Sequence, residues 1–157
     1  MKTIVRALGL ASASMILSAS TALAATPVTV SYAACAFAGP AIVPADSHIT
    51  IALRLGTVTQ QQARSLAKAT TVYVAVGANP AVTAGAGTVA PTSAGWLVEW
   101  DFDTGVDLAA GQALTVFVQA YLSHPLWDGT RDDSGKPVRL PAGALLSPDV
   151  ACTILTA

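Results

Sequence analysis

Charged residues, aromatic residues, histidines and cysteines are all scarce in this chain of 157 residues. Charged residues make up 11% of the sequence and aromatic residues 6%, and there are two cysteines and two histidines. The 8 Lys and Arg residues are outnumbered by 9 Asp and Glu residues. Proteins that bind nucleic acid need clustered Lys and Arg to neutralise phosphates, so this composition argues against a nucleic-acid partner.

The first 24 residues have the three parts of a secretory signal peptide. Lys2 and Arg6 form a basic start, Ala7–Leu17 is uncharged and apolar, and Ala22–Ala24 supplies the small-x-small pattern before the cleavage point. A single membrane anchor is the alternative, but the apolar stretch is short for a span, which needs about 20 apolar residues. We therefore expect cleavage after Ala24.

Cleavage leaves 157 − 24 = 133 residues, enough for one domain at residues 25–157 with a core of its own. The basic start and the abundance of alanine favour a bacterial protein. We expect it to be periplasmic or secreted, with no membrane span after the signal peptide is removed.

The two cysteines, Cys35 and Cys152, enclose nearly the whole mature chain. Two cysteines in an exported protein are most simply a disulfide. No CxxC or HxxxH spacing accompanies them, and His48 and His124 are the only histidines, so we expect neither a metal site nor another cofactor. We expect the bond to tie the first strand to the last. Cys35 has the outward parity of its strand, so either that strand ends or bulges before Cys35 or its core face is the other one.

Apolar and polar residues alternate along most of the mature chain, which predicts antiparallel strands with one buried face each. The expected strands are 28–33, 48–55, 71–77, 96–103, 114–122 and 150–154. The segment Thr59–Ala69 is rich in helix formers instead, and Thr59 with Gln62 fits a capping box, so a short helix is expected there. Loops are expected at 78–95 and 123–149, with a short extended piece at Val138–Leu140.

About seven short strands with turns between them predict an all-β fold, an antiparallel β-sandwich with one helical turn near 59–69. The stretch Leu108–Ala120 has the spacing Leu-x-x-Gly-Gln-x-Leu-x-Val-x-Val-x-Ala. It resembles the E–F corner and F strand of fibronectin type III and related immunoglobulin-like domains, in which a tyrosine stands at the position of Leu114. The resemblance implies an immunoglobulin-like sandwich and no particular function.

The triplet Asp103-Thr104-Gly105 resembles the Asp-Thr-Gly motif of aspartic peptidases. In that family two such aspartates share a proton and activate a water molecule. The same residue types also form turns at strand ends, and this second interpretation is the one we favour.

Four acidic residues follow one another at short spacing: Glu99, Asp101, Asp103 and Asp107. Carboxylates two residues apart on a strand project from the same face, so an oxygen cage for Ca²⁺ is one interpretation. The favoured interpretation is a solvated face of the sheet.

The predicted loop 123–133 gathers one aromatic residue with several polar and charged ones, as recognition loops of sandwiches do. The candidate binding residues are His124, Trp127, Asp128, Arg131 and Asp132. Alternatively, Trp127 packs inward as a plug. His124 is not expected to act with a nucleophile, because Ser123 is its direct neighbour in the sequence.

The segment Thr26–Ala33 alternates ahead of a cysteine, like the extension with which subunits of chaperone–usher fimbriae complete a neighbour's sandwich. The wide spacing of Cys35 and Cys152 departs from that family. We therefore expect an exported, non-catalytic binding or structural module whose partner is a protein or a carbohydrate at the cell surface. The alternatives are a subunit of a surface or fimbrial assembly and, further behind, an aspartic peptidase-like enzyme; the oligomeric state is left open.

Overall fold

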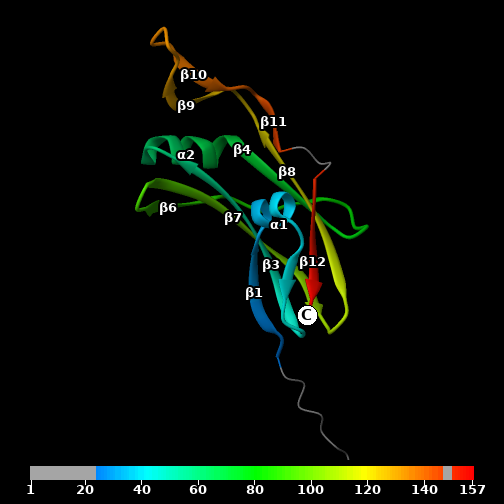
Figure 1. Cartoon of the computed structure of the whole chain (residues 1–157). Coiled ribbons are helices and arrows are strands. Elements are labelled where there is room, and N and C mark those ends of the chain that lie inside the picture. The colour runs from blue at the N-terminus through cyan, green and yellow to red at the C-terminus, as the bar shows by residue number, and fades with distance from the viewer. Residues whose placement is uncertain (1–23, 147–149) are drawn as a thin grey trace, which may run out of the picture.

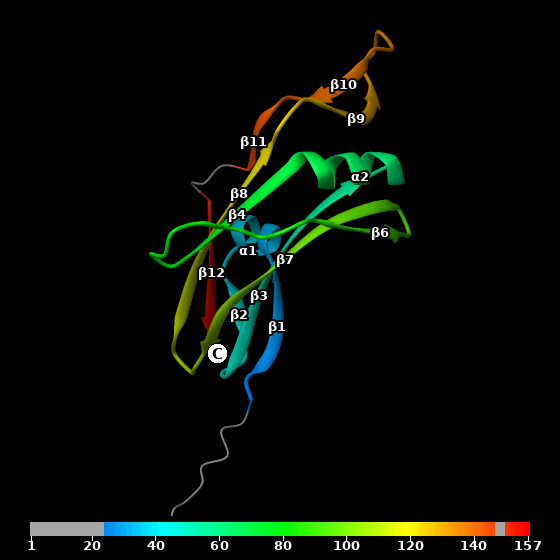
Figure 2. The same cartoon turned by 180° about the vertical axis from the view of Figure 1, so that it is seen from behind.

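The computed structural model describes residues 24–146 and 150–157, which form an all-β fold with two short helices. The predicted signal peptide lies outside the described residues, apart from Ala24. Figures 1 and 2 show a hairpin that projects at one end of the molecule, while the first strand begins and the chain ends at the other. Among the described residues, no helix is long and apolar enough to cross a membrane.

Two helices and twelve strands follow one another along the described chain. Their bounds are β1 Thr26–Ser31, α1 Tyr32–Ala38, β2 Ala41–Val43, β3 Ser47–Thr57, α2 Gln60–Ala69, β4 Thr70–Val76, β5 Val82–Thr83, β6 Thr88–Thr92, β7 Gly95–Leu108, β8 Ala113–Leu122, β9 Leu126–Arg131, β10 Pro137–Leu140, β11 Gly143–Leu146 and β12 Ala151–Thr156.

The strands form two main sheets and a separate hairpin. The four-stranded sheet has the order β1-β3-β7-β6, and the six-stranded sheet has the order β2-β12-β8-β4-β5 with β11 also pairing with β8. The hairpin consists of β9 and β10. Buried side chains of both sheets join in one hydrophobic cluster. The prediction of an all-β, sandwich-like fold is confirmed.

The expected alternation of buried and exposed positions is confirmed in the longest strands. In β3, Ile49, Ile51 and Leu53 are buried, and in β7 Trp100 is 1% exposed. Every second residue of β8 is buried, namely Leu114, Val116, Val118, Ala120 and Leu122. The alternation of apolar and polar residues in the sequence therefore identified the core residues of these strands.

Two strand pairs run parallel, which corrects the prediction of purely antiparallel sheets. β1 runs parallel to β3, with Val28 opposite Ile49, and β2 runs parallel to β12, with Ala41 opposite Ile154. The cause is the path of the chain: after β1 it passes through α1 and enters β2 in the other sheet instead of turning back in a hairpin. Neither strand is therefore paired with its neighbour in sequence.

The first strand ends at Ser31, which resolves the parity of Cys35. Ser31 is the N-cap of α1, and its side chain accepts a hydrogen bond from the Ala34 amide. In a helix, residues three apart share a face, so Tyr32 and Cys35 both point into the core and are buried. Strand parity does not extend into α1, and residues 32 and 33 of the predicted strand belong to the helix.

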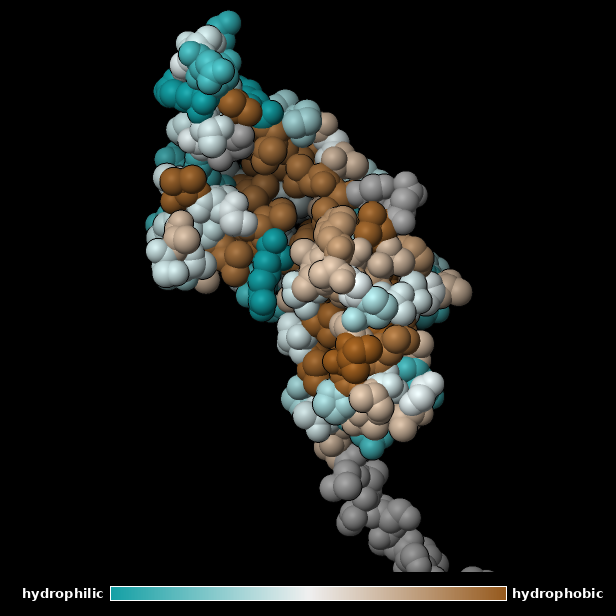
Figure 3. Space-filling model, viewed as in Figure 1, coloured by the Kyte–Doolittle hydropathy of each residue, from teal (hydrophilic) through white to brown (hydrophobic). Residues whose placement is uncertain are grey.

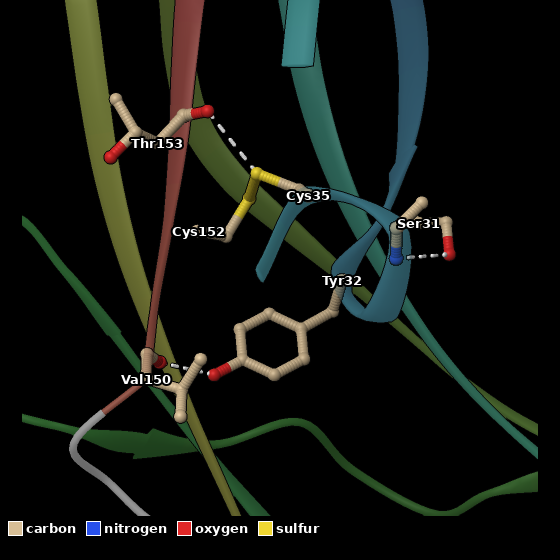
Figure 4. Close-up of a disulfide and its surroundings, with 7 residues drawn as sticks. Ser31, Tyr32, Cys35, Val150, Cys152 and Thr153 are labelled. Carbon is tan, nitrogen blue, oxygen red and sulfur yellow. Dashed lines mark hydrogen bonds between the residues drawn. A yellow bond between two sulfur atoms is a disulfide. The ribbon is translucent and has the colours of Figure 1, made fainter. Parts of the chain in front are cut away.

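The disulfide between Cys35 and Cys152 is present, with the two Cα atoms 5.0 Å apart (Figure 4). It joins α1 to β12, so the expectation that it ties the first strand to the last is wrong. The Tyr32 hydroxyl donates a hydrogen bond of 2.5 Å to the Val150 carbonyl, and its burial raises its pKa. The Cys35 sulfur lies 3.2 Å from the Thr153 carbonyl oxygen; this is a contact without a hydrogen bond, since a disulfide sulfur carries no proton.

The predicted helix is confirmed as α2. The Thr59 side chain accepts a hydrogen bond from the Gln62 amide, and the Gln62 side chain accepts one from the Thr59 amide, which completes the capping box. Ala63, Leu66 and Ala69 recur at intervals of three and are buried. The helix follows β3 in the chain and packs against β3, β6, β7 and β9.

Several strands occur where loops were expected. β5 and β6 lie within 78–95, and β9, β10 and β11 lie within 123–149; the extended piece at Val138–Leu140 is part of β10. These strands bury few side chains, so their sequences lack the apolar alternation that reveals a strand with a core face. With β2, which was also not predicted, the strands β5, β6, β9 and β11 account for twelve strands where about seven were predicted.

The Leu108–Ala120 stretch carries the chain from one sheet to the other. β7 ends at Leu108, and a turn closed by the Gln112 amide and the Ala109 carbonyl leads into β8. The Gln112 side chain also accepts a hydrogen bond from the Ala109 amide, and the Thr156 hydroxyl donates one to the Ala109 carbonyl. Leu114 is buried where the resembling family has its tyrosine, so Gln112 and Thr156 provide the side-chain hydrogen bonds of this corner.

Candidate functional site

The Asp103-Thr104-Gly105 triplet builds an irregularity within β7. The pairing of β3 with β7 shifts between His48 and Thr50, and Gly105 adopts a left-handed φ of 65°. Asp103 accepts a hydrogen bond from the Gly105 amide, and the Thr104 hydroxyl donates one to the Ile49 carbonyl. All three residues thus have structural partners. The triplet forms a bulge inside β7, which continues to Leu108, and this corrects the expectation of a turn at the end of a strand.

His48 lies between two of the acidic residues. Its Nδ1 is 2.5 Å from an Asp107 carboxylate oxygen, and its Nε2 is 2.8 Å from an Asp103 oxygen. The hydrogen bond to Asp107, followed by the one to Asp103, raises the pKa of His48. The pKa of Asp103 is lowered, chiefly by the Gly105 amide and then by His48. The cluster is exposed to water and forms a surface ion network.

The acidic series proposed for Ca²⁺ is divided between two basic partners, Arg54 and His48. Glu99 pairs with Arg54, whose Nε is 2.5 Å from the carboxylate, and Asp103 and Asp107 face His48. Asp101 is exposed on the same strand. Within residues 24–146 and 150–157, no three His, Cys, Asp or Glu side chains are grouped so that they could hold a metal ion.

The predicted recognition loop 123–133 contains β9, the first strand of the hairpin, and two of its charged residues lie at the hairpin tip. The Asp132 carboxylate accepts hydrogen bonds from the Ser134 amide and hydroxyl and from the Lys136 amide, and these bonds lower its pKa. Arg131 donates to the Gly135 carbonyl at 2.7 Å. Both charges therefore shape the tip. The side chain of Asp128 lies outside the described part of the structure.

Trp127 lies at the base of the hairpin, where β9 packs against α2. Its indole nitrogen donates a hydrogen bond of 2.7 Å to the Thr130 carbonyl, and the residue is 45% exposed. With Thr59 and Gln62 it lines a small cleft of about 160 Å³. Gly129 allows the close approach, because a Cβ there would collide with the Gln62 side chain. Trp127 is thus a half-exposed contact between hairpin and helix.

Ser123 and His124, which were not expected to act together in catalysis, contact each other. The Ser123 hydroxyl lies 2.9 Å from His124 Nδ1, just after β8 ends and the chain bends away from the sheet. In a catalytic triad, a carboxylate on the other ring nitrogen of the histidine orients that base. Among the described side chains, no carboxylate makes this contact with His124. The pair is exposed and is a local hydrogen bond between neighbours.

A surface feature that sequence reasoning missed lies on the outer face of β4 and β8. Tyr73 is directly opposite Gln119, and Thr71 is directly opposite Tyr121. We call this feature the tyrosine depression; its volume is about 440 Å³. It is lined by Thr71, Tyr73, Ala81, Gln119, Tyr121 and Ser123.

The two tyrosines of the depression are diagonal neighbours and meet at a steep angle. Their ring centroids are 6.0 Å apart and the ring planes make an angle of 77°. The Tyr121 hydroxyl is 3.5 Å from the Gln119 side-chain oxygen, and Tyr121 is 39% exposed. The sequence carried a signal, since both tyrosines stand at outward positions of predicted strands. Only the register of β4 against β8 brings them together.

A second hollow, of about 400 Å³, separates β1 from β2 and reaches α1. β1 and β2 are edge strands of different sheets, so the hollow lies where the two layers open. Figure 3 shows hydrophobic side chains gathered over this part of the surface, below α1. We call it the β1–β2 groove.

Comparison with known proteins gives no relative from which a function could be read. No family model, no curated protein and no solved structure matches the chain significantly.

Proposed function

We propose that this chain is an exported binding module without catalytic activity, and that the tyrosine depression is its binding site. The observation that carries the proposal is the depression itself, an open hollow with two aromatic rings and several polar groups on paired strands. Ligand sites combine apolar or aromatic walls with a few polar groups that fix orientation, and their usual volumes include this one. Side chains on paired strands are held more firmly than those on loops, so the site is preorganised.

Export is supported by two independent features. The first 24 residues have the pattern of a secretory signal peptide, and the mature chain has a disulfide, a bond that persists in oxidising compartments. A bacterial periplasm or the surrounding medium would suit both. The partner would then be a protein or a carbohydrate met outside the cytosol.

A binding array tests this proposal across several classes of ligand at once. The mature protein, residues 25–157, is applied to an array that carries neutral glycans, acidic glycans and peptides. We expect binding to at least one class, lost in Tyr121→Ala and retained in Phe37→Ala. Phe37 is a matched control because it is an aromatic residue, 66% exposed, on α1. Absence of binding, or binding that both variants retain, would contradict the proposal.

A second function, as a subunit of a surface assembly, is favoured by the β1–β2 groove. Edge strands are normally protected by charges, because their unpaired backbone groups invite another strand. Here the sequence from Thr26 to Ala45 has no charged residue, and Phe37 and Ile42 are 66% and 63% exposed. A second copy of this acidic chain could approach there without charge repulsion. The occupant we propose is therefore another copy of the chain.

β1 is already paired with β3 of its own chain, so it is not a free donor strand like the extension of a fimbrial subunit. Association would instead add a strand at the open edges. Light scattering at increasing concentration tests this: we expect the wild type to associate and Ile42→Lys to remain monomeric. Val58→Lys is the control, since Val58 is 64% exposed outside the groove. A wild type that stays monomeric at every concentration would exclude the assembly.

A further inference from the structure

We propose that the tyrosine depression binds an uncharged saccharide. This inference rests on the proposed function and specifies the chemical class of its ligand. Three properties of the depression carry it: the lining has no charge, its aromatic rings form a corner, and its polar groups both donate and accept hydrogen bonds.

The lining residues are two tyrosines, one alanine, one glutamine, one threonine and one serine. None of these side chains is charged at neutral pH. A phosphate, a carboxylate or an ammonium ligand would lose water on binding and find no counter-charge in the lining. Nucleotides, acidic glycans and charged peptides are therefore disfavoured, and a neutral ligand fits.

The tyrosine rings are nearly perpendicular, with an interplanar angle of 77°. One flat aromatic ligand cannot stack on both rings at once in this arrangement. A sugar ring has C–H groups on its faces and along its rim, and these groups suit the electron-rich face of an aromatic ring. A corner of two rings can contact one sugar unit on two sides.

The polar groups suit hydroxyl-rich ligands. Gln119 provides an acceptor oxygen and two N–H donors, and the Thr71 hydroxyl both donates and accepts. The Ser123 hydroxyl, which contacts His124 Nδ1, still accepts a hydrogen bond. Sugar hydroxyls have the same dual character, so either polarity of hydrogen bond can be satisfied. Gln119 lies directly opposite Tyr73 in the pairing of β4 with β8, which places its amide beside the aromatic wall.

The tyrosine depression is open and shallow on a sheet face, and this shape suits a section of a longer saccharide chain. A saccharide that lies along the strands can continue beyond both ends of the depression. We expect weak binding per site, because an open site leaves one side of the ligand in water. The ligand is accordingly a neutral oligosaccharide or polysaccharide.

Titration by NMR and calorimetry tests this inference with the mature protein. The probes are cellohexaose, maltohexaose, N-acetylated chitohexaose and, as the acidic comparison, oligogalacturonate. We expect at least one neutral probe to bind and to shift the amide signals of Thr71, Tyr73 and Tyr121, with oligogalacturonate binding at least about tenfold more weakly. Loss of the Tyr121 ring in Tyr121→Ala should weaken binding about tenfold or more, which corresponds to about 1.4 kcal/mol or more. Tyr121→Phe should bind nearly as well as the wild type, because the ring remains.

The outcomes separate this inference from the function on which it rests. If none of the neutral probes binds, if the acidic probe binds equally well, or if Tyr121→Ala binds like the wild type, the saccharide inference is wrong. If the array nevertheless records Tyr121-dependent binding to peptides, the chain is a binding module with another class of ligand. If neither experiment records Tyr121-dependent binding, both proposals fail. Circular dichroism of each variant confirms that it is folded.

Discussion

Breaking the Cys35–Cys152 disulfide should cost this protein a large part of its stability while leaving its native fold in place. The bond joins residues 117 apart in sequence. In the chain-entropy model, a loop of that length removes about 16 cal/mol/K from the unfolded ensemble, or about 5 kcal/mol at 25 °C. Domains have about 5–15 kcal/mol in total, so the bond would supply a third or more. For a domain of about 130 residues, we expect the melting temperature to fall by about 15–20 °C.

The native fold should survive because other contacts hold α1 against β12. Tyr32 is buried beside the bond and its hydroxyl donates to the Val150 carbonyl. The bond acts mainly on the unfolded chain, which becomes more extended when the link is cut. We therefore expect a larger m-value for the reduced protein, since more surface is exposed on unfolding.

The assay is urea unfolding of the mature protein with and without reductant, followed by tryptophan fluorescence, because Trp100 is buried in the core. The double variant Cys35→Ala/Cys152→Ala is the control, and reductant should not change its unfolding curve. A difference in unfolding free energy below about 1 kcal/mol would refute the entropic argument. So would a reduced protein that has lost its near-ultraviolet circular dichroism before urea is added, because the bond would then be needed for the native packing itself.

Two further predictions concern the core and the surface ion network. Gly87→Ala should destabilise the protein by about 1–3 kcal/mol in urea unfolding, because the new Cβ would lie 2.6 Å from the buried Trp100 ring. The control is Gly56→Ala, whose Cβ would have no atom within 4 Å outside its chain neighbours, and it should change stability by less than about 0.5 kcal/mol. Equal effects of the two substitutions would contradict the packing argument. The pKa of His48 is raised in the folded protein by Asp107 and then by Asp103. The contribution of His48 to the stability of the fold is therefore complete below its pKa in the unfolded chain, near 6.5, and is lost as the pH rises through its pKa in the folded protein. The melting temperature of His48→Gln should therefore lie further below that of the wild type at roughly pH 5.5 than at roughly pH 9. An equal difference at both pH values would show that the imidazolium does not contribute to stability.

The core could be predicted from the sequence because burial imposes a period on it. Leu114–Leu122 alternates without interruption, and each expected inward residue is buried. The capping box of Thr59 and Gln62 was predictable for a similar reason, since its hydrogen bonds join residues three apart. Local or strictly periodic constraints leave a direct record in the sequence.

The structural features that were not predicted from the sequence depend on a change of period or on pairing between residues far apart in the chain. At Ser31 the chain passes from a period of two to a helix, and Cys35 therefore points inward although strand parity placed it outward. No described residue of β9 or β10 is fully buried, so their sequences lack the apolar alternation that reveals a strand with a core face. The tyrosine depression requires Tyr73 and Tyr121 to be diagonal neighbours, and this depends on a register between strands far apart in the chain.

The order of strands in the six-stranded sheet makes the two proposed surfaces independent. β12 lies between β2, at one edge of the groove, and β8, which forms the tyrosine depression together with β4. Changes at sites that share no contacts usually add in their effects. Ile42→Lys should therefore abolish association without weakening saccharide binding, and Tyr121→Ala should do the reverse. If Ile42→Lys also weakened saccharide binding, association would have to complete the ligand site, and a binding module and an assembly subunit would be one function of this chain.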